Sequence, residues 1–512
     1  MGSSELLVVL DRDSSTPLQQ QVCDGIAALV RSGRLRPGEA VPASRELAQQ
    51  LGVSRTVILR AYELLCTHGV LTARRGSGTR VAEQAEAPPA QPARPRPARE
   101  HQRPQPPRAT DGGDALWQPW EPPPTHHPGV ALDFRHGTPA LANFPVSRWR
   151  QSMHEAYARA DAAALGYGPA EGSPALRAQI ATLVRQSRAL TATPDRILVT
   201  SGATQALDIL VRLLVGPGDV VVIEDPSHTV LRQVFGCSQA TVVPVPVDEE
   251  GLRVADIDAR VRAHGQDPAR VKVVYVTPSH QFPTGFIMSE ARRRALLAWA
   301  YERGATVLED DYHNEFTFAA ERLPALAADR HRDTVVYVGS FSKTLFPALR
   351  IGYAVLPPRL VQPFLGIKWI TDRLTPTVTQ DALADFIATG AYARHISRMT
   401  RLYRQRRGRL LDGLYEHFGA GVRISGAAAG LHVLVTLTGA RGAGEDEIVR
   451  RAAARGVRIY AASGYFVQDP PAEPTFLMGY AALPAARITE GVALLAAAVR
   501  ESTAARPTAT HP

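Results

Sequence analysis

Lysine is almost absent from this chain of 512 residues: of its 58 Lys and Arg residues, only Lys272, Lys343 and Lys368 are lysine. Arg is always protonated, whereas a partly buried Lys can lose its proton and attack an aldehyde. A general preference for Arg is enough to explain Lys272 and Lys368 as chance positions. Lys343 lies in the segment YVGSFSKTLFPALRIGY (337–353), and its hydroxyl-bearing neighbours favour a chemical role for the amine.

Cysteine and long hydrophobic runs are scarce as well. Cys23, Cys66 and Cys237 are far apart and form no CxxC pair, which argues against a disulfide framework or a zinc site and fits a reducing cytoplasm. No apolar run approaches the roughly 20 residues that cross a bilayer, and the N-terminal residues lack the pattern of a secretory signal. We therefore expect a cytoplasmic protein without a membrane partner. The net charge of +9 favours a polyanionic partner.

Composition divides the chain into unequal regions. Between Pro88 and Pro128 lie 13 of the 40 prolines, with few large apolar residues. Residues 83–130 are therefore predicted to form a semi-rigid, largely disordered linker, whose arginines either touch DNA phosphates or only keep it soluble. Residues 1–82 form a compact module before the linker. Residues 131–500 form a larger domain after it, and residues 501–512 are expected to be a frayed tail.

In the larger domain, apolar β-branched runs alternate with helical stretches rich in Ala, Leu and Arg. Strands that are apolar throughout and separated by helices are typical of a mostly parallel sheet covered on both faces. The larger domain is therefore predicted to be α/β. The runs that we read as strands are RILVT (196–200), DVVVI (219–223), VKVVYV (271–276), ATVL (305–308) and TVVYV (334–338).

The first module carries the pattern of three helices and two strands. Apolar residues at helical spacing predict helices over residues 18–30 and 44–51 and between Ser54, a plausible N-cap, and Gly69. Residues 70–81 (VLTARRGSGTRV) predict two short strands joined by a Gly-Ser-Gly turn. This order of elements predicts an α+β winged helix-turn-helix. The alternative is a small helical domain whose arginines are merely solvated.

DNA contacts are expected from the third helix, which carries Arg55, Thr56 and Arg60 on one face, and from the basic wing. The string PLQQQV…LRPGEAVPASRELAQQLGVSRTVILRAYELL…GVLTARRGSGTRV also resembles the GntR family DNA-binding domain over residues 16–81. One departure is Val57, where related proteins often carry Thr. Together, the basic surface and the resemblance predict these DNA-contacting residues: Arg45, Ser54, Arg55, Thr56, Arg60, Arg75 and Gly76.

Two segments of the larger domain predict an anion site beside an amine. TSGATQAL (200–207) follows a predicted strand and opens a helix, so its N–H groups and the helix dipole face an anion, although tight turns need the same small residues. The second segment places two hydroxyls, of Ser340 and Ser342, and the guanidinium of Arg350 near Lys343. This combination suits a phosphate ester held beside a Schiff base.

Two further segments stand at strand ends. LEDDY (308–312) ends a predicted buried strand, where a carboxylate is costly unless it meets a cation such as the protonated ring nitrogen of pyridoxal phosphate. An acidic cluster at a strand end is also typical of a metal site or a solvent-facing loop. TPSHQFPTG (277–285) is predicted to be a loop at the carboxyl edge of the sheet, where such folds bind ligands.

Together these segments resemble the fold-type I aminotransferases over about residues 131–500, with a mostly parallel central sheet. The resemblance implies pyridoxal 5'-phosphate (PLP) as cofactor, with Lys343 as its Schiff-base lysine. It implies further cofactor contacts from Asp310 to the pyridine nitrogen, from Tyr312 to the ring hydroxyl, and from Ala203, Thr204, Ser340, Ser342 and Arg350 to the phosphate. Tyr167 would reach the phosphate of the partner subunit, which implies a homodimer.

Several positions depart from working aminotransferases. Phe282 stands where the enzymes have Asn and is expected to pack on the cofactor ring instead. His228 stands where an aromatic ring stacks on the pyridine, and His313 follows Tyr312 where sensor relatives often carry Asp. The segment TFLMGYA (475–481) lacks the Arg that grips the substrate carboxylate in aminotransferases, and Val230 offers no replacement cation. Little or no transaminase turnover is therefore expected.

A GntR-type module joined by a long linker to this fold resembles the MocR subfamily of bacterial regulators, whose members use the aminotransferase-like domain as a sensor. The resemblance implies a cytoplasmic, dimeric, PLP-dependent transcriptional regulator that binds operator DNA and senses an amino acid, an amine or a B6 vitamer. Two alternatives remain open. One is that the chain is an active aminotransferase with a DNA-binding appendage. The other is that it is a DNA-binding protein whose larger domain is only a dimerisation scaffold.

Overall fold

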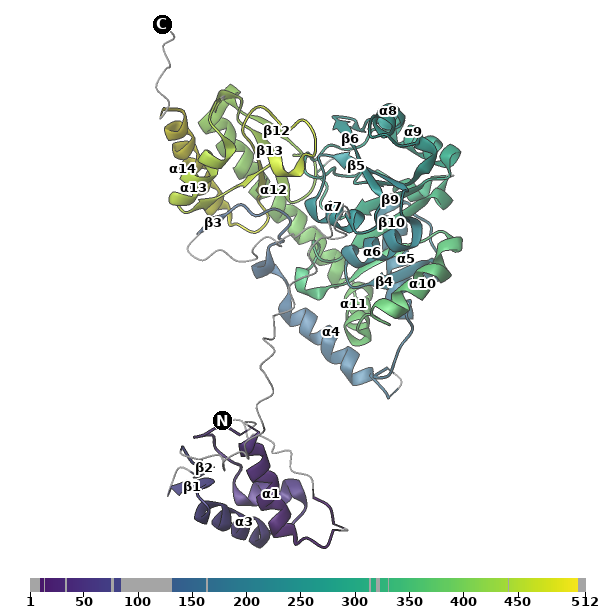
Figure 1. Cartoon of the computed structure of the whole chain (residues 1–512). Coiled ribbons are helices and arrows are strands. Elements are labelled where there is room, and N and C mark those ends of the chain that lie inside the picture. The colour runs from purple at the N-terminus through teal and green to yellow at the C-terminus, as the bar shows by residue number, and fades with distance from the viewer. Residues whose placement is uncertain are drawn as a thin grey trace, which may run out of the picture. The chain divides into compact units, whose positions relative to one another are not determined.

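The computed structural model describes residues 10–12, 14–32, 35–74, 78–83, 131–162, 164–312, 315–318, 323–329, 331–440 and 442–504. The chain forms two compact units, Met1–Thr110 and Asp111–Pro512 (Figure 1). Apart from Glu83, the predicted linker lies outside the described residues. Each unit has a hydrophobic core of its own.

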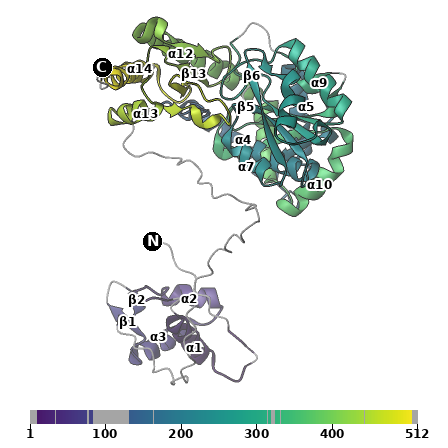
Figure 2. The ribbon, with the colours of Figure 1, turned by 45° about the horizontal axis from the view of Figure 1, so that its top comes forward.

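The first unit has the predicted order of three helices followed by two strands. Gly52 ends the second helix in the left-handed conformation, with φ of 63°, which glycine adopts without steric cost. Helices and strands bury one common core, which includes Val22, Ile26, Leu47 and Ile58. The elements, seen together in Figure 2, are α1 (Leu18–Arg31), α2 (Ser44–Leu51), α3 (Arg55–Thr67), β1 (Leu71–Arg74) and β2 (Gly78–Val81).

The second unit is built on a sheet of eight strands, and the predicted parallel arrangement is confirmed for its centre. Strands β10, β9, β8, β5 and β6 pair in parallel, whereas β11 is antiparallel to both of its neighbours and β7 is antiparallel to β6. In spatial order the strands are β4 (Ile197–Thr200), β11 (Gly352–Val355), β10 (Val335–Ser340), β9 (Thr306–Asp311), β8 (Val271–Val276), β5 (Val220–Asp225), β6 (Thr241–Asp248) and β7 (Gly251–Leu252).

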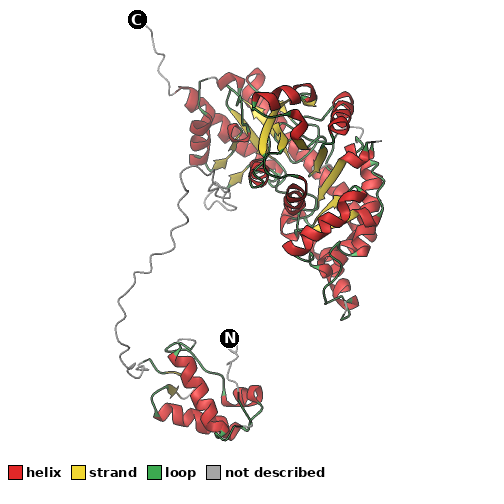
Figure 3. Ribbon diagram, turned by 45° about the vertical axis from the view of Figure 1, so that its right-hand side comes forward, coloured by secondary structure: helices red, strands yellow, loops and turns green. Residues whose placement is uncertain are grey.

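Both faces of this sheet are covered, as Figure 3 shows by secondary structure. Alternate residues of one strand enter different cores: Val220 and Val222 face one core, while Val221 and Ile223 face the other. Because side chains alternate along a strand, this division requires helices on both sides. The first core takes in α5 (Pro174–Arg188), α8 (Ile257–Ala263), α9 (Glu290–Arg303) and α11 (Thr377–Ala388), and the second takes in α6 (Ala203–Leu214), α7 (Thr229–Gly236) and α10 (Pro358–Thr371).

A smaller antiparallel sheet lies in the C-terminal part of the unit, together with α12 (Ala391–Phe418), α13 (Glu445–Ala454) and α14 (Ala485–Ala504). Its strand order is β12 (Arg423–Ser425), β13 (His432–Thr436), β16 (Thr475–Gly479) and β15 (Tyr460–Ala461). The start of the unit is tied to this part, because β3 (Leu132–Asp133) pairs in parallel with β14 (Val457–Arg458). Helix α4 (Val146–Arg159) packs on α11.

The C-terminal helix runs further than the sequence suggests. Helix α14 continues to Ala504, whereas a tail was expected from Glu501. Glu501 forms ion pairs with Arg451 and Arg455, and Ser502 is buried, so these residues add contacts that keep the last turn helical. Among the described residues, every helix is too short or too polar to cross a membrane.

Candidate functional site

One cavity of about 180 Å³ gathers most of the residues predicted to hold a cofactor. It lies where β8, β9 and β10 end and where α6 begins, at the carboxyl edge of the parallel strands. Of the predicted cofactor-binding residues, Tyr167 alone is not part of its lining. The cavity is lined by Ala203, Thr204, Leu207, His228, Val230, Leu231, Tyr275, Thr277, Phe282, Asp310, Tyr312, Ser340, Ser342, Lys343 and Arg350.

Lys343 follows β10 and points its amine into this cavity. Its Nζ donates a hydrogen bond to the carbonyl oxygen of Gly137 at 2.8 Å. Gly137 has φ of 67°, and a Cβ atom there would stand 2.9 Å from Nζ, so a larger residue would crowd the amine. Burial lowers the pKa of Lys343, with Asp310 acting in the opposite direction and Arg350 in the same one. The neutral amine, which is the nucleophilic form, is thereby favoured.

Strand β9 separates three consecutive carboxylates by the alternation of its side chains. Asp310 faces the cavity, whereas Glu309 and Asp311 both approach Arg188, with Asp311 Oδ2 at 2.7 Å from Arg188 Nε. Asp311 also accepts from the Tyr337 hydroxyl at 2.6 Å. The two outer carboxylates of β9 therefore form a buried ionic cluster, and the middle one is left for the cavity.

Only one of the two carboxylate oxygens of Asp310 has a hydrogen-bond partner among the described residues. Its Oδ2 accepts from the Tyr275 hydroxyl at 2.8 Å, while its buried Oδ1 has no hydrogen-bond partner among the described residues. Burial raises the pKa of Asp310 to about 6, with the bond from Tyr275 working against that rise. A cationic N–H group next to Oδ1 would stabilise the ionised form.

The turn before α6 forms an anion cradle. Arg350 Nη2 donates to the carbonyl oxygen of Ser201 at 2.9 Å, which places the guanidinium beside the first N–H groups of the helix. Gly202 has φ of 91°, and a Cβ atom there would stand 2.6 Å from Arg350 Nη2. On the other side, the Ser342 backbone N–H donates to Ser340 Oγ at 3.2 Å. Backbone donors, hydroxyls and one guanidinium thus converge on the same end of the cavity.

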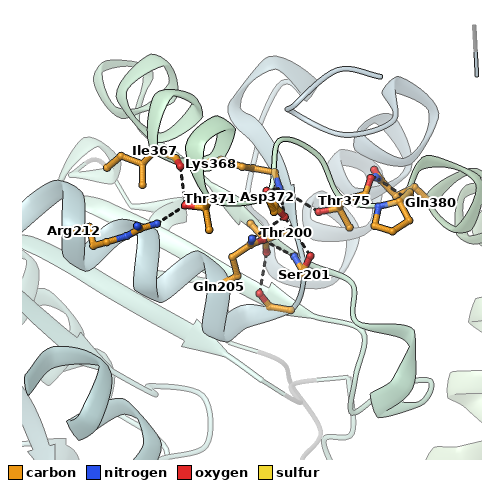
Figure 4. Close-up of polar contacts among 12 residues, drawn as sticks. Thr200, Ser201, Gln205, Arg212, Ile367, Lys368, Thr371, Asp372, Thr375 and Gln380 are labelled. Atoms are coloured by element: carbon orange, nitrogen blue, oxygen red, sulfur yellow. Dashed lines mark hydrogen bonds and ion pairs between the residues drawn. The ribbon is translucent and has the colours of Figure 1, made fainter. Parts of the chain in front are cut away.

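A buried lysine supports this cradle from behind (Figure 4). Lys368, with a fully buried side chain, donates to Asp372 Oδ1 at 2.9 Å, to Asp372 Oδ2 at 3.1 Å and to Thr375 Oγ1 at 3.2 Å. Asp372 in turn accepts from Gln205 at 2.7 Å, and Gln205 accepts from the backbone N–H of Ser201 at 2.7 Å. The interpretation of Lys368 as a chance position was wrong: its ammonium is satisfied and fixes the turn before α6.

Aromatic rings surround Phe282, which lines the cavity together with His228. The centroid of Phe282 lies 4.9 Å from that of His228, 5.2 Å from that of Tyr465 and 5.7 Å from that of His136. His228 Nδ1 accepts from the Val230 N–H at 3.2 Å, which fixes the ring at the N-terminus of α7. Burial lowers the pKa of His136 to about 3 and that of His228 to about 4, so both imidazoles are neutral at physiological pH.

Tyr312 and Tyr167 are placed differently. Tyr312 lines the cavity, but its hydroxyl donates to the His280 carbonyl oxygen at 2.9 Å. Tyr167 is 78% exposed and contacts the guanidinium of Arg373, whose central carbon lies 5.4 Å from the ring centroid. Exposed Trp369 and Ile370 lie close by in sequence to Arg373, and Arg373 also contacts the Trp369 ring. Tyr167 therefore belongs to an exposed apolar surface of its own chain.

The predicted DNA-contacting residues that the structure describes lie on the surface of the first unit. Ser54, Arg55, Thr56 and Arg60 are exposed at the N-terminal half of α3, and Arg45 is exposed on α2. Ser54 stands at the N-cap position of α3 but its side chain makes no capping hydrogen bond. Arg55 Nε donates to Ser44 Oγ at 3.3 Å, which draws α2 and α3 together. Arg75 and Gly76 lie outside the described residues, as does His313 in the second unit.

Sequence reasoning missed several residues of the cavity and its wall. Tyr275, which holds Asp310, reads as an ordinary core residue of the run VKVVYV. His136 and Tyr465 come from segments more than 300 residues apart, and the Tyr465 hydroxyl lies 3.4 Å from His136 Nε2. The pairing of β3 with β14, together with the hydrogen bond from the Gly479 N–H to the Phe134 carbonyl oxygen, brings the first of these segments to the C-terminal part. A signal for Tyr275 was present, because its position is two residues before the loop that was singled out.

The residues of the cavity fit PLP on two independent observations. The buried, unpartnered Oδ1 of Asp310 is the acceptor that a protonated pyridine nitrogen requires. The cradle formed by the α6 N-terminus and Arg350 supplies the donors and the charge that a phosphate ester requires. Lys343, whose pKa is lowered, lies between them on the same cavity.

Comparisons with known proteins agree on both units. Residues 18–81 match the family model of bacterial regulatory proteins of the gntR family, and residues 131–493 match that of class I and II aminotransferases. Over 506 residues the chain is 33% identical to the probable rhizopine catabolism regulatory protein MocR of Rhizobium meliloti, with 98% of each chain covered. It is 32% identical over 467 residues to the HTH-type pyridoxine biosynthesis transcriptional regulator PdxR of Corynebacterium glutamicum, covering 90% of this chain and 92% of that protein.

A solved structure resembles the second unit. The crystal structure of LysN, an alpha-aminoadipate aminotransferase from Thermus thermophilus complexed with N-(5'-phosphopyridoxyl)-L-leucine, shares 30% identity at a TM-score of 0.65. The match covers 74% of this chain and 94% of that structure. The part of the chain that holds the cavity is thus similar to a PLP enzyme, whereas the two regulators match the chain across both units.

Proposed function

Because this chain belongs to the MocR-type transcriptional regulators of the GntR family, with PLP as its cofactor, we propose that it works as a homodimer whose operator binding changes when a small effector enters the cofactor cavity. The effector is an amino compound or a B6 vitamer, and the protein acts in the cytoplasm, where operator DNA lies. The observation that carries this proposal is that Lys343 and the unpartnered Oδ1 of Asp310 face one cavity.

Each part of PLP has a partner among the residues of the cavity. Lys343 is the amine for the aldehyde, Asp310 the acceptor for the pyridine nitrogen, and Arg350 the cation for the phosphate. When bound, PLP supplies an aldehyde that combines reversibly with amines. Further contacts come from Ala203, Thr204, Ser340 and Ser342 at the phosphate end and from His228, Phe282 and Tyr312 at the ring.

The protein groups also control protons at this site. Burial keeps part of the Lys343 population neutral, because its pKa is lowered. Asp310 retains Oδ1 as an acceptor, since Tyr275 already donates to Oδ2. The low exposure of Asp310, 8%, excludes water from that acceptor, so a ligand cation there would gain a strong interaction.

The first unit reads the operator. Helix α3 would enter the major groove with Arg55, Thr56 and Arg60, while Ser54, whose hydroxyl makes no capping bond, is available for a phosphate. Arg45 on α2 and Arg75 and Gly76 of the wing would contact the backbone. Two copies of this unit in a dimer would read two half-sites.

The exposed surface around Tyr167 supports the dimer. Tyr167, Trp369 and Ile370 are large apolar residues with exposures of 78%, 47% and 79%. Such a cluster on a soluble protein marks an interaction site. In a homodimer, Tyr167 would cover the phosphate end of the partner subunit's cavity, so each cavity would be complete only in the assembled dimer.

Regulation requires that effector and operator favour different states of the dimer, and the coupling must be reciprocal. Efficient transamination is not expected. The segment TFLMGYA carries no Arg, and the described cations of the cavity lining are Lys343 and Arg350, both placed for the cofactor. An amino acid would thus lack the usual carboxylate partner.

The test uses the full chain, reconstituted with PLP. We expect a visible absorbance band that borohydride removes, and an effector-dependent change in binding to a DNA fragment that carries the promoter next to the gene. The Lys343→Ala variant is the control, since it should lose the band but keep basal DNA binding. A wild-type protein without the band would overturn the proposed cofactor role of Lys343, and steady turnover without any effect on DNA binding would favour an enzyme.

A further inference from the structure

Phe282 of the cavity lining packs into a hydrophobic cluster that also includes Leu477, a residue of the segment TFLMGYA that carries no Arg. Leu477 lies at the centre of β16, is fully buried, and is paired in register with Leu434 of β13 and Tyr460 of β15. These neighbours pack with Phe282 and Ala462 in one hydrophobic cluster. Two departures from the enzymes, the missing Arg of β16 and the Phe in place of Asn at position 282, thus meet in the same cluster.

Three described cations near this cluster, Arg135, Arg232 and Arg458, are not part of the cavity lining, and Arg458 stacks on Tyr460 with its guanidinium carbon 5.4 Å from the ring centroid. Arg135 lies on Asp133, with Nη2 to Oδ2 at 3.4 Å, and its Nε donates to the Tyr460 hydroxyl at 3.3 Å. Arg232 donates to the Gly464 carbonyl oxygen at 2.6 Å. Of the described residues that line the cavity, the cationic ones are Lys343 and Arg350, and Arg350 is held at the cradle by Ser201.

The imidazoles of the wall do not supply charge either. His136 and His228 are neutral because burial, and then nearby cations, lower their pKa values to about 3 and about 4. His228 Nδ1 is an acceptor for a backbone N–H, which a protonated ring could not be. With Phe282 and Tyr465, these rings form an uncharged aromatic surface.

We propose that the effector of this cavity is a primary amine with an uncharged, apolar or aromatic body, and that an α-carboxylate weakens its binding. The inference rests on the proposed function and narrows its effector class. A carboxylate packed against Phe282 would lose its hydration without gaining a cation, which is costly in a buried site. An aromatic body would instead pack edge-to-face on Phe282 and Tyr465.

Three ligands of one skeleton test the role of the carboxylate. The PLP-loaded full chain is titrated with 2-phenylethylamine, L-phenylalanine and L-phenylalaninamide, and the change in the visible band gives half-saturating concentrations. We expect the amine to act at a concentration at least about tenfold lower than L-phenylalanine, equivalent to 1.4 kcal/mol. The amide keeps the size of the amino acid but lacks the negative charge of its carboxylate. Its half-saturating concentration should therefore be close to that of 2-phenylethylamine.

The titration separates this proposal from the proposed function. A preparation without any PLP band would defeat the proposed function itself. A band that responds to L-phenylalanine at an equal or lower concentration than to 2-phenylethylamine, or to none of the three ligands, would overturn the effector class alone.

A pair of substitutions at position 477 tests whether the missing cation causes the preference for an amine without a carboxylate. Leu477→Arg should lower the half-saturating concentration of L-phenylalanine by about tenfold or more relative to that of 2-phenylethylamine, whereas Leu477→Met should keep the wild-type preference. Since a buried Arg at position 477 threatens folding, Val230→Arg provides a second variant. Val230 lines the cavity and is partly exposed, so a cation there is tolerated. Wild-type preference in a folded Val230→Arg and Leu477→Arg protein would overturn the proposal.

Discussion

Lys343 and Lys368, both in the second unit, have very different surroundings. Comparing them shows how a ligand-binding site differs from a part of the structure that only supports it. Lys368 offers three N–H donors and meets three acceptors on Asp372 and Thr375. Among the described residues, Lys343 makes one hydrogen bond, to the Gly137 carbonyl oxygen, and it faces a cavity in which Asp310 Oδ1 has no hydrogen-bond partner. Natural proteins seldom leave buried polar atoms unsatisfied, so the deficit around Lys343 indicates a ligand that completes it.

The comparison also explains why each residue is Lys. A compact ammonium with three donors fits the three acceptors around Lys368, which a planar guanidinium would not. At position 343 the relevant property is the titratable amine. Scarcity of lysine pointed to Lys343 but gave no signal for Lys368, whose place is explained by its three acceptors.

The largest effect is expected for the substitution Lys343→Ala. It removes the amine that PLP is expected to bind covalently, so the borohydride-sensitive visible band should disappear altogether. The protein should remain folded, because the residue makes one hydrogen bond to a backbone carbonyl. Absorbance and circular dichroism of the same sample check both statements. A borohydride-sensitive band that persists in Lys343→Ala would assign the covalent role to another residue.

Asp310→Asn should weaken PLP binding by about 10- to 100-fold, because a hydrogen bond between charged partners contributes about 1.5–3 kcal/mol. Equilibrium titration of the apoprotein with PLP measures this. Equal affinity in wild type and variant would remove the role of Asp310 as the ring-nitrogen partner.

In the apoprotein, Asp310→Asn should be favourable instead of harmful, because it removes a pH-dependent loss of stability. Burial raises the pKa of Asp310 to about 6, above its ordinary 3.8, so the folded state retains the proton and this contribution to stability is lost as the pH rises through about 6. The loss amounts to at most about 3 kcal/mol. Without PLP, Asp310→Asn should therefore show a smaller decline in Tm between pH 4 and pH 7 than the wild type, in about the window from 4 to 6.

Lys368→Met tests the scaffold side of the comparison. The substitution leaves Asp372, whose side chain is 23% exposed, without its cation and should cost about 1–3 kcal/mol of stability. The visible band should survive at saturating PLP. Lys272→Met is the matched control, since Lys272 is exposed on β8 and should change stability by less than about 0.5 kcal/mol. Loss of the band with unchanged Tm would instead make Lys368 part of the site.

The smallest expected effect is that of Thr375→Val. It removes one of the three acceptors of Lys368, at 3.2 Å, while preserving shape, and should cost about 1 kcal/mol in urea unfolding. The variant should bind PLP as the wild type does. A cost as large as that of Lys368→Met would show that the network acts as one cooperative unit.

Much of the site was accessible from sequence because its parts are local. The Ser340–Arg350 segment, the turn TSGAT and Asp310 each stand at a strand end, and parallel strands bring their carboxyl ends to one edge. The alternation of α and β segments likewise predicted the parallel centre of the sheet. In the first unit, turn residues such as Gly52 marked the helix ends.

The rest depended on contacts between distant segments. His136 reaches Phe282 through the pairing of β3 with β14 and the hydrogen bond from Gly479 to Phe134, and no local sequence pattern indicates this contact. Lys368 could not be separated from a chance residue because its neighbour Asp372 connects it to the turn before α6 only through Gln205, which is 167 residues away from Asp372 in the sequence. The extent of α14 was missed for the same reason, since Arg455 anchors Glu501 from another helix.

Strand β9 directs Asp310 to the cavity and Glu309 and Asp311 to Arg188, and only the alternation of side chains along the strand distinguishes the two neighbouring aspartates. A single residue inserted in the strand before Glu309 would move Glu309 to the position that faces the cavity and Asp310 to the position beside Arg188. Length variation among natural or designed versions of this protein should therefore be tolerated around β9 only in whole loops, never inside the strand.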